Sequence, residues 1–476
     1  MADPRGAGHP AESGFAGLEV LVAGAGVSGR SAAEALLAAG AKVTVTDAAE
    51  ERLAALASVQ AEGARLVTGL AEPPPGTRLV VTSPGWRPGT PLLAAATAAG
   101  TEVVGEVELA WRLDRARPDG GATWLAVTGT NGKTTTVGML ESILRAAGLD
   151  AVACGNVGLP VVDAVRAGHR VLAVELSSFQ LHWSPSVRPL AGAVLNVAED
   201  HLDWHGSMAA YAQAKARILT GEVAVAGVDD TNAAALLAEA PAQRRIGATL
   251  AEPGPDQLGL VGDELVDRAF ADGEVLAAVG DVRPGGPPGL TDALVAAALA
   301  RTYGVPAQAV RNGLRSFQPA AHRAALVAES GGVRYVDDSK ATNPHAALAS
   351  LTTHPRVVWV AGGQLKGASV DDLVATVAPR LAGVVLLGVD RARFAEALAR
   401  HAPGVPVHEV TAGDDGAMRE AVRTARAMAR PGDVVMLAPA AASLDMFPDY
   451  AHRGRAFAEA VQAVIAEGGA PGGTGR

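Results

Sequence analysis

Apolar runs alternate with helical patterns along most of the chain, which predicts an α/β fold with largely parallel sheets. The alternation predicts a strand, a helix and a second strand over residues 18–26, 28–40 and 41–47. Further strand–helix units begin at residues 124–136 and 333–343. This order is typical of parallel sheets, in which helices connect neighbouring strands.

The chain of 476 residues is long enough for about three domains of ordinary size, each with its own core. The pattern breaks near the charged residues 112–121 and again near residues 316–323. We therefore expect three domains, over residues 1–115, 116–319 and 320–476.

Composition narrows the class of protein. Hydrophobic residues make up 49% of the chain and charged residues 19%, which is typical of a globular protein. The formal net charge of −10 argues against broad nucleic-acid binding. A single cysteine, Cys154, excludes an internal disulfide framework and fits a reducing compartment. Residues 1–14 lack a signal-peptide core, and no apolar stretch reaches about 18 residues, so we expect a cytoplasmic monomer without nucleic-acid or membrane partners.

A glycine motif, Gly24-Ala-Gly26-Val-Ser-Gly29, lies between the first predicted strand and helix. Its glycines permit a tight turn and bring a diphosphate close to the helix N-terminus, where free amides favour anions. Asp47 ends the next strand and is placed to accept a hydrogen bond from a sugar hydroxyl. The motif alone is weak, because it indicates a diphosphate and not hydride transfer. A nicotinamide-dependent dehydrogenase stays open as an alternative.

A second glycine-rich loop, AVTGTNGKTTT over residues 126–136, again joins a predicted strand to a helix. Gly129 and Gly132 allow backbone amides to surround a phosphate, Lys133 can neutralise its oxygens, and Thr134 can offer a hydroxyl to Mg²⁺. Val127 stands where the strict consensus has glycine, so the loop is a variant of the phosphate-binding pattern. Nucleotide binding is favoured over a purely structural turn.

Three further side chains are candidates for a metal site. Glu175 ends a predicted strand and His201 lies in a loop after another, but each could instead cap a helix or face solvent. Lys215 lies within the apolar stripe of the helix predicted over residues 207–219. Desolvation there favours a neutral amine, which can capture CO₂ as a carbamate and so become an anionic metal ligand. Helix geometry alone instead favours an amine that reaches solvent from the edge of the stripe.

Lysine usage gives an independent signal. Only five of the 40 basic residues are lysine, and the others are arginine. A lysine that persists in such a chain is a candidate for chemistry that a guanidinium cannot perform, although chance persistence is the alternative. Four of the five lie in candidate motifs: Lys133, Lys215, Lys340 and Lys366.

Several of these motifs together resemble the Mur ligase family. They are GTNGKTT (129–135), GNVGLP (155–160), ELSSFQL (175–181), LNVAEDHLD (195–203), AHR (321–323), DSKATN (338–343) and PAAASLDMF (439–447). The likeness runs in order from about residue 18 to about residue 465. It implies a Rossmann-like domain for a UDP-sugar, a central ATPase, and a C-terminal dinucleotide-fold-like domain for an incoming amino acid.

The resemblance also implies the residues of the site. ATP would be bound by Gly129, Thr130, Asn131, Gly132, Lys133, Thr134, Thr135, Arg323 and Asp338. Mg²⁺ would be held by Thr134, Glu175, His201 and a carbamylated Lys215, and the catalytic group would be Lys133, Glu175, His201 and Lys215. The UDP-linked acceptor would contact Ser28, Asp47, Gly85, Asn156, Ser177 and Gln180, and the amino acid would contact Thr342, Lys366, Ser443 and Tyr450.

Within the family, the likeness is greatest to the members that add D-glutamate to UDP-N-acetylmuramoyl-L-alanine in peptidoglycan synthesis. The implied chemistry is ATP-dependent amide-bond formation through an acyl phosphate, with the domains closing to exclude water. Other cell-wall amino-acid ligases, folylpolyglutamate synthases and a non-catalytic nucleotide-binding protein stay open as alternatives.

The chain departs from the family at a few positions. Gly289 and Asp292 stand where the family often has asparagines that read adenine, so base selectivity is relaxed or supplied by other groups. Ala48 and Ala49 follow Asp47 where an arginine or threonine sometimes stands, and Arg52 is a candidate to compensate. Tyr450 replaces a frequent phenylalanine, which is a mild change.

Overall fold

The computed structural model describes residues 14–319, 321–411 and 416–469. Two predictions concern residues outside the described ones. They are the absence of a signal-peptide core in residues 1–14, of which only the last is described, and the start of the third domain at residue 320. The chain divides into two compact units. The first contains the chain up to Val197 with Gly206–Val282 and Leu290–Phe317, and the second contains Ala198–His205, Arg283–Gly289 and the chain from Gln318.

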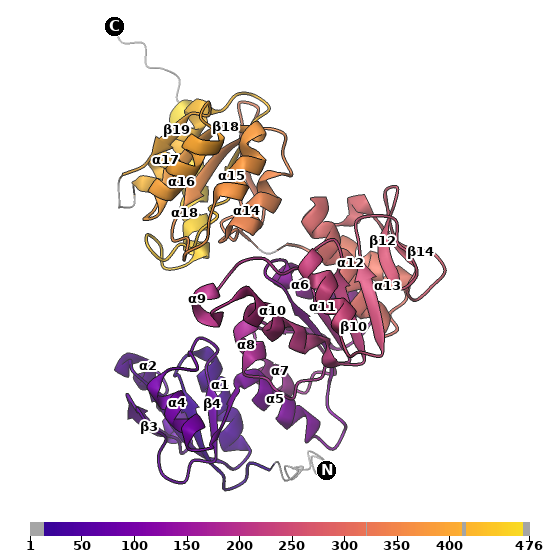
Figure 1. Ribbon diagram of the computed structural model, residues 1–476, viewed down its shortest axis with the longest axis vertical. Helices are drawn as coiled ribbons and strands as arrows, with labels where there is room; N and C mark the ends of the chain where they lie inside the picture. Colours follow the sequence, from indigo (N-terminus) through magenta and orange to yellow (C-terminus); the bar gives the residue numbers. More distant parts are fainter. Residues whose placement is uncertain (1–13, 320, 412–415, 470–476) are drawn as a thin grey trace, which may run out of the picture. The chain divides into compact units, whose positions relative to one another are not determined.

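The first sheet of the first unit has five parallel strands in the order β3-β2-β1-β4-β5 (Figure 1). The strand, helix and strand predicted near the amino terminus are confirmed as β1 Glu19–Ala23, α1 Val27–Ala38 and β2 Lys42–Asp47. The remaining elements are α2 Glu50–Ala54, α3 Ala57–Ala61, β3 Arg65–Thr68, β4 Leu79–Thr82, α4 Pro91–Ala98 and β5 Glu102–Gly105. Since β1 is central, the loop that follows it lies at the middle of the sheet edge where ligands bind in such folds.

The second sheet of this unit has nine strands in the order β14-β13-β12-β11-β10-β9-β6-β8-β7. Its strands are β6 Thr123–Thr128, β7 Ala151–Gly155, β8 Val171–Glu175, β9 Ala191–Val194, β10 Val223–Gly227, β11 Arg244–Ala248, β12 Gln257–Val261, β13 Glu264–Asp267 and β14 Glu274–Ala278. The strands β6 to β12 run parallel to one another in this sheet. At its edge, β13 is antiparallel to β12, and β14 is antiparallel to β13. Because β6 lies between β8 and β9, the residues after these three strands meet at one edge of the sheet.

Helices pack on both faces of these sheets. In sequence order they are α5 Glu106–Arg115, α6 Lys133–Ala146, α7 Val161–Arg166, α8 Ser178–His182, α10 Met208–Ala216, α11 Thr231–Glu239, α12 Gly286–Thr302 and α13 Ala307–Ser316. The short helix α9 Leu202–His205 belongs to the second unit. Small residues dominate α12, where Ala293, Ala296 and Ala297 are fully buried in the core of the nine-stranded sheet. Alanine allows the helix to approach the strands closely, which explains how a chain poor in aromatic residues fills this core.

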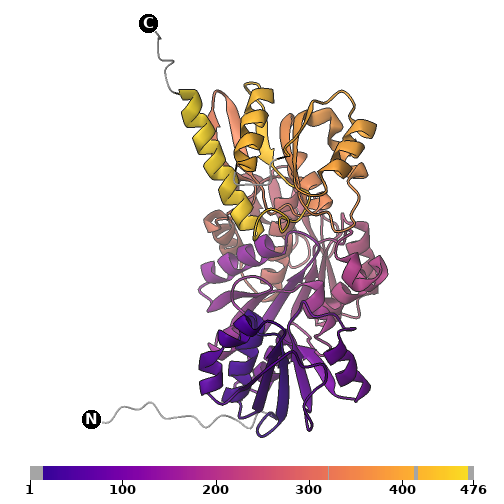
Figure 2. The same ribbon diagram turned by 90° about the vertical axis from the view of Figure 1, so that its left-hand side faces the viewer.

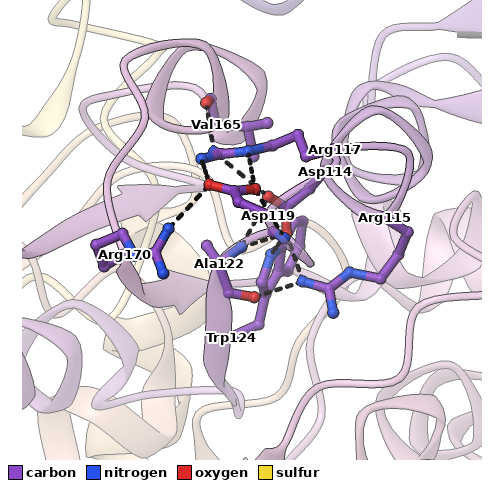
Figure 3. A network of polar contacts seen from close by, with 9 residues as sticks. Asp114, Arg115, Arg117, Asp119, Ala122, Trp124, Val165 and Arg170 are labelled. Atoms are coloured by element: carbon purple, nitrogen blue, oxygen red, sulfur yellow. Dashed lines mark hydrogen bonds and ion pairs between the residues drawn. The ribbon is translucent and has the colours of Figure 1, made fainter. Parts of the chain in front are cut away.

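The connection between the two sheets of the first unit is fixed by a buried carboxylate (Figure 3). Asp114 is fully buried and accepts hydrogen bonds from the Ala122 N–H, at 2.9 Å, and from Trp124 Nε1, at 2.9 Å. The Arg115 guanidinium donates to the same carboxylate at 2.6 Å, and Arg117 lies 3.7 Å away. A buried charge with several donors is stabilised. The region in which the pattern of the sequence breaks is therefore a rigidly bonded turn, and the predicted domain boundaries stay a prediction.

Two further contacts hold α7, one from α5 and one from α1. The Val162 N–H donates to the buried carboxyl of Glu106 at 2.7 Å, and Ser31 Oγ donates to Asp163 at 2.7 Å. Burial raises the pKa of Glu106 to about 7, although the backbone donors of α7 act in the opposite direction.

The second unit contains a six-stranded sheet in the order β15-β16-β20-β17-β18-β19, in which only β15 is antiparallel to its neighbour. The strands are β15 Ala325–Ser330, β16 Val333–Asp337, β17 Val357–Gly362, β18 Leu381–Leu387, β19 Val407–Glu409 and β20 Val434–Leu437. The helices are α14 Pro344–Leu351, α15 Asp371–Val377, α16 Arg391–His401, α17 Ala417–Met428 and α18 Tyr450–Gly469. Figure 2 shows α18 as the long yellow helix beside these strands.

The three sheets confirm the predicted α/β class with largely parallel strands. None of the described helices combines the length and the apolar content needed to cross a membrane.

Candidate active site

The glycine loop, residues 24–29, turns tightly between β1 and α1. Gly24 has φ +107°, and a Cβ there would lie 2.3 Å from Ser83 Oγ. A Cβ on Gly29 would lie 1.8 Å from the Gly24 carbonyl oxygen. Both positions therefore require glycine. Ser28 lies in the first turn of α1, and the predicted contact Gly85 is exposed in the turn that follows β4.

Asp47 is bonded to this loop. Its carboxylate accepts hydrogen bonds from the Ala25 N–H at 2.9 Å and the Ala49 N–H at 3.0 Å. Burial alone would raise the pKa of Asp47, but these donors together with Arg52 lower it below its ordinary value. Arg52 Nη1 lies 3.8 Å from the carboxylate, in the place suggested for a compensating arginine.

The phosphate loop, residues 129–135, runs from the end of β6 into α6. Gly132 caps α6 with φ +88°. Lys133 Nζ donates to the carbonyl oxygens of Gly129 at 2.8 Å and Thr130 at 2.9 Å. The amine thus lies over the loop, where it can meet the oxygens of a bound phosphate. Thr134 and Thr135 follow in the first turn of the helix.

Lys215, on α10, also reaches the Gly129 carbonyl oxygen. Its side chain is 1% exposed, and Nζ donates to the Gly129 carbonyl oxygen at 2.7 Å. The ammonium lies 4.5 Å from the ring centroid of Tyr211, whose hydroxyl is 3.1 Å from Thr130 Oγ1. The alternative of an amine that reaches solvent is therefore wrong. Two amines, from α6 and α10, share one carbonyl oxygen.

Glu175 ends β8 beside β6 and is 3% exposed. Asn156 Nδ2 donates to Glu175 Oε1 at 2.9 Å, and the Asn156 N–H donates to the Glu175 carbonyl oxygen at 2.8 Å. Ser177 and Gln180 form a capping box at the start of α8, in which the Ser177 N–H donates to Gln180 Oε1 at 2.9 Å. Among the predicted substrate contacts, Asn156 is thus positioned by Glu175, and Ser177 and Gln180 position each other.

His201 lies in residues 198–205, which belong to the second unit. It has φ +55°, and its Nε2 lies 3.6 Å from Asp200. Among the described residues, no three histidine, cysteine, aspartate or glutamate side chains converge as a metal site. The first unit offers the buried carboxylate of Glu175, the Thr134 hydroxyl and Lys215. A carboxylate and a hydroxyl fit Mg²⁺, which binds few protein oxygens and keeps several waters.

The candidate amino-acid residues lie in the second unit, on loops after three neighbouring strands. The order β16-β20-β17 places Thr342, Ser443 and Lys366 after adjacent strands. The Ala440 N–H donates to the Ala341 carbonyl oxygen at 2.9 Å. Gln364 and Ala442 exchange two backbone hydrogen bonds of 2.9 Å. The three loops are therefore joined backbone to backbone.

Lys366 is exposed with φ +51°, while Ser443 is 4% exposed. Tyr450 begins α18, and Lys340 Nζ lies 3.9 Å from the centroid of its ring. The ring that the resemblance assigns to the amino acid thus contacts one of the five lysines.

Arg323 is presented by a turn of unusual backbone. His322 and Ala324, on either side of it, have φ +65° and +48°. His322 Nδ1 lies 2.6 Å from Asp337, and the Ala324 N–H donates to Asp338 at 3.2 Å. Burial raises the pKa of Asp338 to about 6, against the effects of Ser350, of the Ala324 N–H and of Arg323. Both oxygens of Asp338 accept hydrogen bonds from the protein.

Gly289 and Asp292, which stand where the family often has asparagines, differ in their surroundings. A Cβ on Gly289 would lie 1.8 Å from the Pro284 carbonyl oxygen, so a side chain there requires the backbone to move. Asp292 is 6% exposed, and its Oδ1 lies 2.3 Å from the position of a Cβ on Gly132. An asparagine at 289 thus requires a shift of the backbone, and Asp292 lies beside the phosphate loop.

Asn196 fixes the phosphate loop and was not predicted. Its Oδ1 accepts from the Asn131 N–H at 2.9 Å, its Nδ2 donates to the Asn131 carbonyl oxygen at 3.3 Å, and its own carbonyl oxygen accepts from the Thr130 N–H at 3.0 Å. Tyr211 lies in the helix predicted over residues 207–219, but no role in the site was predicted for it. The available signal for Asn196 was an asparagine two residues after the end of β9, the strand beside β6.

Comparison with known families identifies three matching regions. Residues 18–105 match the Mur ligase MurD-like N-terminal domain, residues 127–251 the Mur ligase middle domain, and residues 322–441 the Mur ligase glutamate ligase domain. 

Two curated relatives are named UDP-N-acetylmuramoylalanine–D-glutamate ligase. The protein of Nocardia farcinica is 55% identical, over 94% of this chain and 97% of its own. The protein of Mycobacterium tuberculosis H37Rv is 52% identical, over 98% of both chains. 

Solved structures share the fold at low identity. The UDP-N-acetylmuramate–alanine ligase of Thermotoga maritima matches with TM-score 0.56 and 18% identity, over 94% of this chain and 99% of its own. A pseudomurein peptide ligase type C of Methanothermus fervidus matches with TM-score 0.58 and 16% identity, over the same shares.

The bonds of Asn196 generate a prediction. In Asn196→Ala the Asn131 backbone loses two hydrogen bonds to the Asn196 side chain, so the loop is less ordered before it meets a phosphate. Loss of about 1 to 1.5 kcal/mol corresponds to roughly tenfold weaker binding of a fluorescent ATP analogue. Asn232→Ala is the control, because Asn232 Nδ2 donates to the Val197 carbonyl oxygen and not to the loop. Unchanged ATP affinity in Asn196→Ala would show that the loop is ordered without this residue.

Proposed function

Because this chain belongs to the Mur ligase family, we propose that it joins D-glutamate to UDP-N-acetylmuramoyl-L-alanine in an ATP-dependent reaction of peptidoglycan synthesis. Support comes from relatives of that name that are more than 50% identical over nearly the whole chain. The proposal retains the expectation of a cytoplasmic monomer.

The chemistry explains why the site has its charges. A carboxylate is a poor electrophile, so an oxygen of the alanine carboxylate first attacks the γ-phosphorus of ATP, and ADP leaves. The amine of D-glutamate then attacks the acyl carbon, loses a proton, and inorganic phosphate leaves with the new amide bond formed. Both steps crowd negative charge together, and preorganised cations and N–H donors stabilise it.

The observation that carries the proposal is the convergence of Lys133 and Lys215 on the Gly129 carbonyl oxygen. The alternative of a nicotinamide-dependent dehydrogenase, which is based on the first glycine motif, gives these two amines no role. In the proposed reaction, Lys133 neutralises the phosphate oxygens as charge moves onto the leaving ADP. The glycine loop and Asp47 hold the UDP part of the acceptor, with the diphosphate at the N-terminus of α1.

Mg²⁺ fits the residues at this edge of the central sheet. Glu175 and Thr134 would hold it, and Asn156 would keep the carboxylate of Glu175 in place through the 2.9 Å hydrogen bond. When bound, Mg²⁺ neutralises charge on the phosphate oxygens. His201 completes the proposed set from the resemblance alone.

We further propose that Lys215 is carbamylated. A neutral Nζ adds to CO₂, forms an N–C bond and releases a proton, which leaves a carboxylate on the side chain. Two features favour the neutral amine: its 1% exposure and the second amine, Lys133 Nζ, that shares its carbonyl acceptor. The product converts a cation into an oxygen ligand suited to Mg²⁺.

The amino-acid specificity is tested by phosphate release. Wild-type protein is given ATP, Mg²⁺ and UDP-N-acetylmuramoyl-L-alanine with a panel of amino acids that includes D-glutamate, L-alanine, L-lysine and L-glutamate. We expect release that depends on D-glutamate and on the UDP-linked acceptor together. Release with a different amino acid would identify a sister ligase, and release without an acceptor would contradict the proposal.

The carbamate is tested by Lys215→Arg, which keeps the charge but cannot form a carbamate. We expect ligase activity to fall by about a hundredfold or more, because an anionic ligand is replaced by a cation beside the phosphates. Lys42→Arg is the matched control, since Lys42 is an exposed lysine paired with Glu19. Activity of Lys215→Ala should return with added short carboxylates, whereas full activity in Lys215→Arg would exclude the carbamate.

A further inference from the structure

Arg453, in the first turn of α18, is a fully buried cation with 0% exposure. A buried guanidinium is costly unless its donors are satisfied. Burial lowers the pKa of Arg453 to about 10, with Asp445 and Asp337 acting in the opposite direction, so the group stays charged at neutral pH. Apolar side chains of similar volume are often at least as stable in such positions, so a buried charge here indicates a role beyond packing.

The three nitrogens of Arg453 bind two separate loops. Nε donates to Ser339 Oγ at 3.0 Å and Nη2 donates to the Ser339 carbonyl oxygen at 2.9 Å. Nη1 donates to the Ala441 carbonyl oxygen at 3.0 Å. Ser339 Oγ in turn donates to the Tyr450 carbonyl oxygen at 2.7 Å. One planar group therefore joins the loop after β16, the loop after β20 and the start of α18.

Each of these segments carries a residue of the proposed amino-acid site. Thr342 lies three residues after Ser339, Ser443 lies two residues after Ala441, and Tyr450 is the residue that accepts from Ser339. Lys340, next to Ser339, has its ammonium 3.9 Å from the centroid of the Tyr450 ring. The position of the guanidinium thus sets the spacing between side chains that come from distant parts of the sequence.

The neighbouring residue makes this close packing possible. A Cβ on Gly454 would lie 2.2 Å from His322 Nδ1 and 2.8 Å from Asp337 Oδ2. A glycine inside a helix is unfavourable by itself, so its presence indicates that the helix must approach the His322–Asp337 pair. The first turn of α18 is therefore held against the ends of both β16 and β20.

We propose that Arg453 is a positioning residue for the amino-acid substrate, acting through the Ser339 and Ala441 backbone to fix Thr342, Ser443 and Tyr450. The inference rests on the proposed function, because that function assigns these three residues to the amino acid. Arg453 itself makes no contact with substrate in this account. Its planar donors reach two carbonyl oxygens and a hydroxyl at once, a geometry that the single ammonium of lysine does not reproduce.

The test compares Arg453→Met and Arg453→Lys with wild type. Arg455→Met is the matched control, since Arg455 lies two residues further along the same helix and is exposed. Phosphate release is measured while the amino acid that wild type accepts, ATP and the UDP-linked acceptor are varied in turn. We expect the KM for the amino acid to rise about tenfold or more in Arg453→Met, corresponding to loss of one or more fixed contacts. The KM values for ATP and the acceptor should stay within about twofold.

Arg453→Lys should lie between Arg453→Met and wild type, because one donor can still bind one of the loops. This variant decides the matter if Arg453→Met fails to fold, as judged by circular dichroism. An unchanged KM for the amino acid, or equal increases for all three substrates, would overturn the proposal. Wild-type protein that releases no phosphate with any amino acid would instead contradict the proposed function, so the two failures are distinguishable.

Discussion

The hydrogen bond from Lys215 Nζ to the Gly129 carbonyl oxygen is the contact around which the first unit is arranged. It joins α10 to the first residue of the phosphate loop, and Lys133 binds the same oxygen from α6. Asn196 holds the next part of the loop, so strand ends, loop and two helices have one fixed geometry. Preorganisation of this kind lets a phosphate bind without first ordering the backbone, and Lys133 puts positive charge where the reaction develops negative charge.

The second unit uses a similar solution with a different residue. Arg453 is as deeply buried as Lys215, and it too binds backbone carbonyl oxygens of loops that follow strands. In both units a buried nitrogen-bearing side chain holds a loop through its backbone carbonyl oxygens. The lysine is the one that can change chemically, by taking up CO₂, whereas the arginine keeps its charge and its planar geometry. The choice of residue thus matches the role that we propose for each.

Much of the fold followed from hydrophobic period and glycine placement. The α/β class, α1 and β2 were predictable because their apolar residues recur with one clear period. The antiparallel strands β13 and β14 were not, because short apolar runs do not reveal strand direction. In the site, the position of Lys215 in an apolar stripe was visible, but the direction of its amine depends on α6 and β6, far away in sequence. The same holds for Asn196 and Arg453, whose partners are tertiary.

The central claim is that a carboxylate of the acceptor is phosphorylated before the amine attacks. The most direct measurement uses UDP-N-acetylmuramoyl-L-alanine with ¹⁸O in both carboxylate oxygens, together with ATP, Mg²⁺ and D-glutamate. Mass spectrometry of the phosphate should find one ¹⁸O in each molecule released, because the phosphate leaves with the oxygen that attacked the γ-phosphorus. Unlabelled phosphate, formed at the same rate as the amide product, would contradict the account.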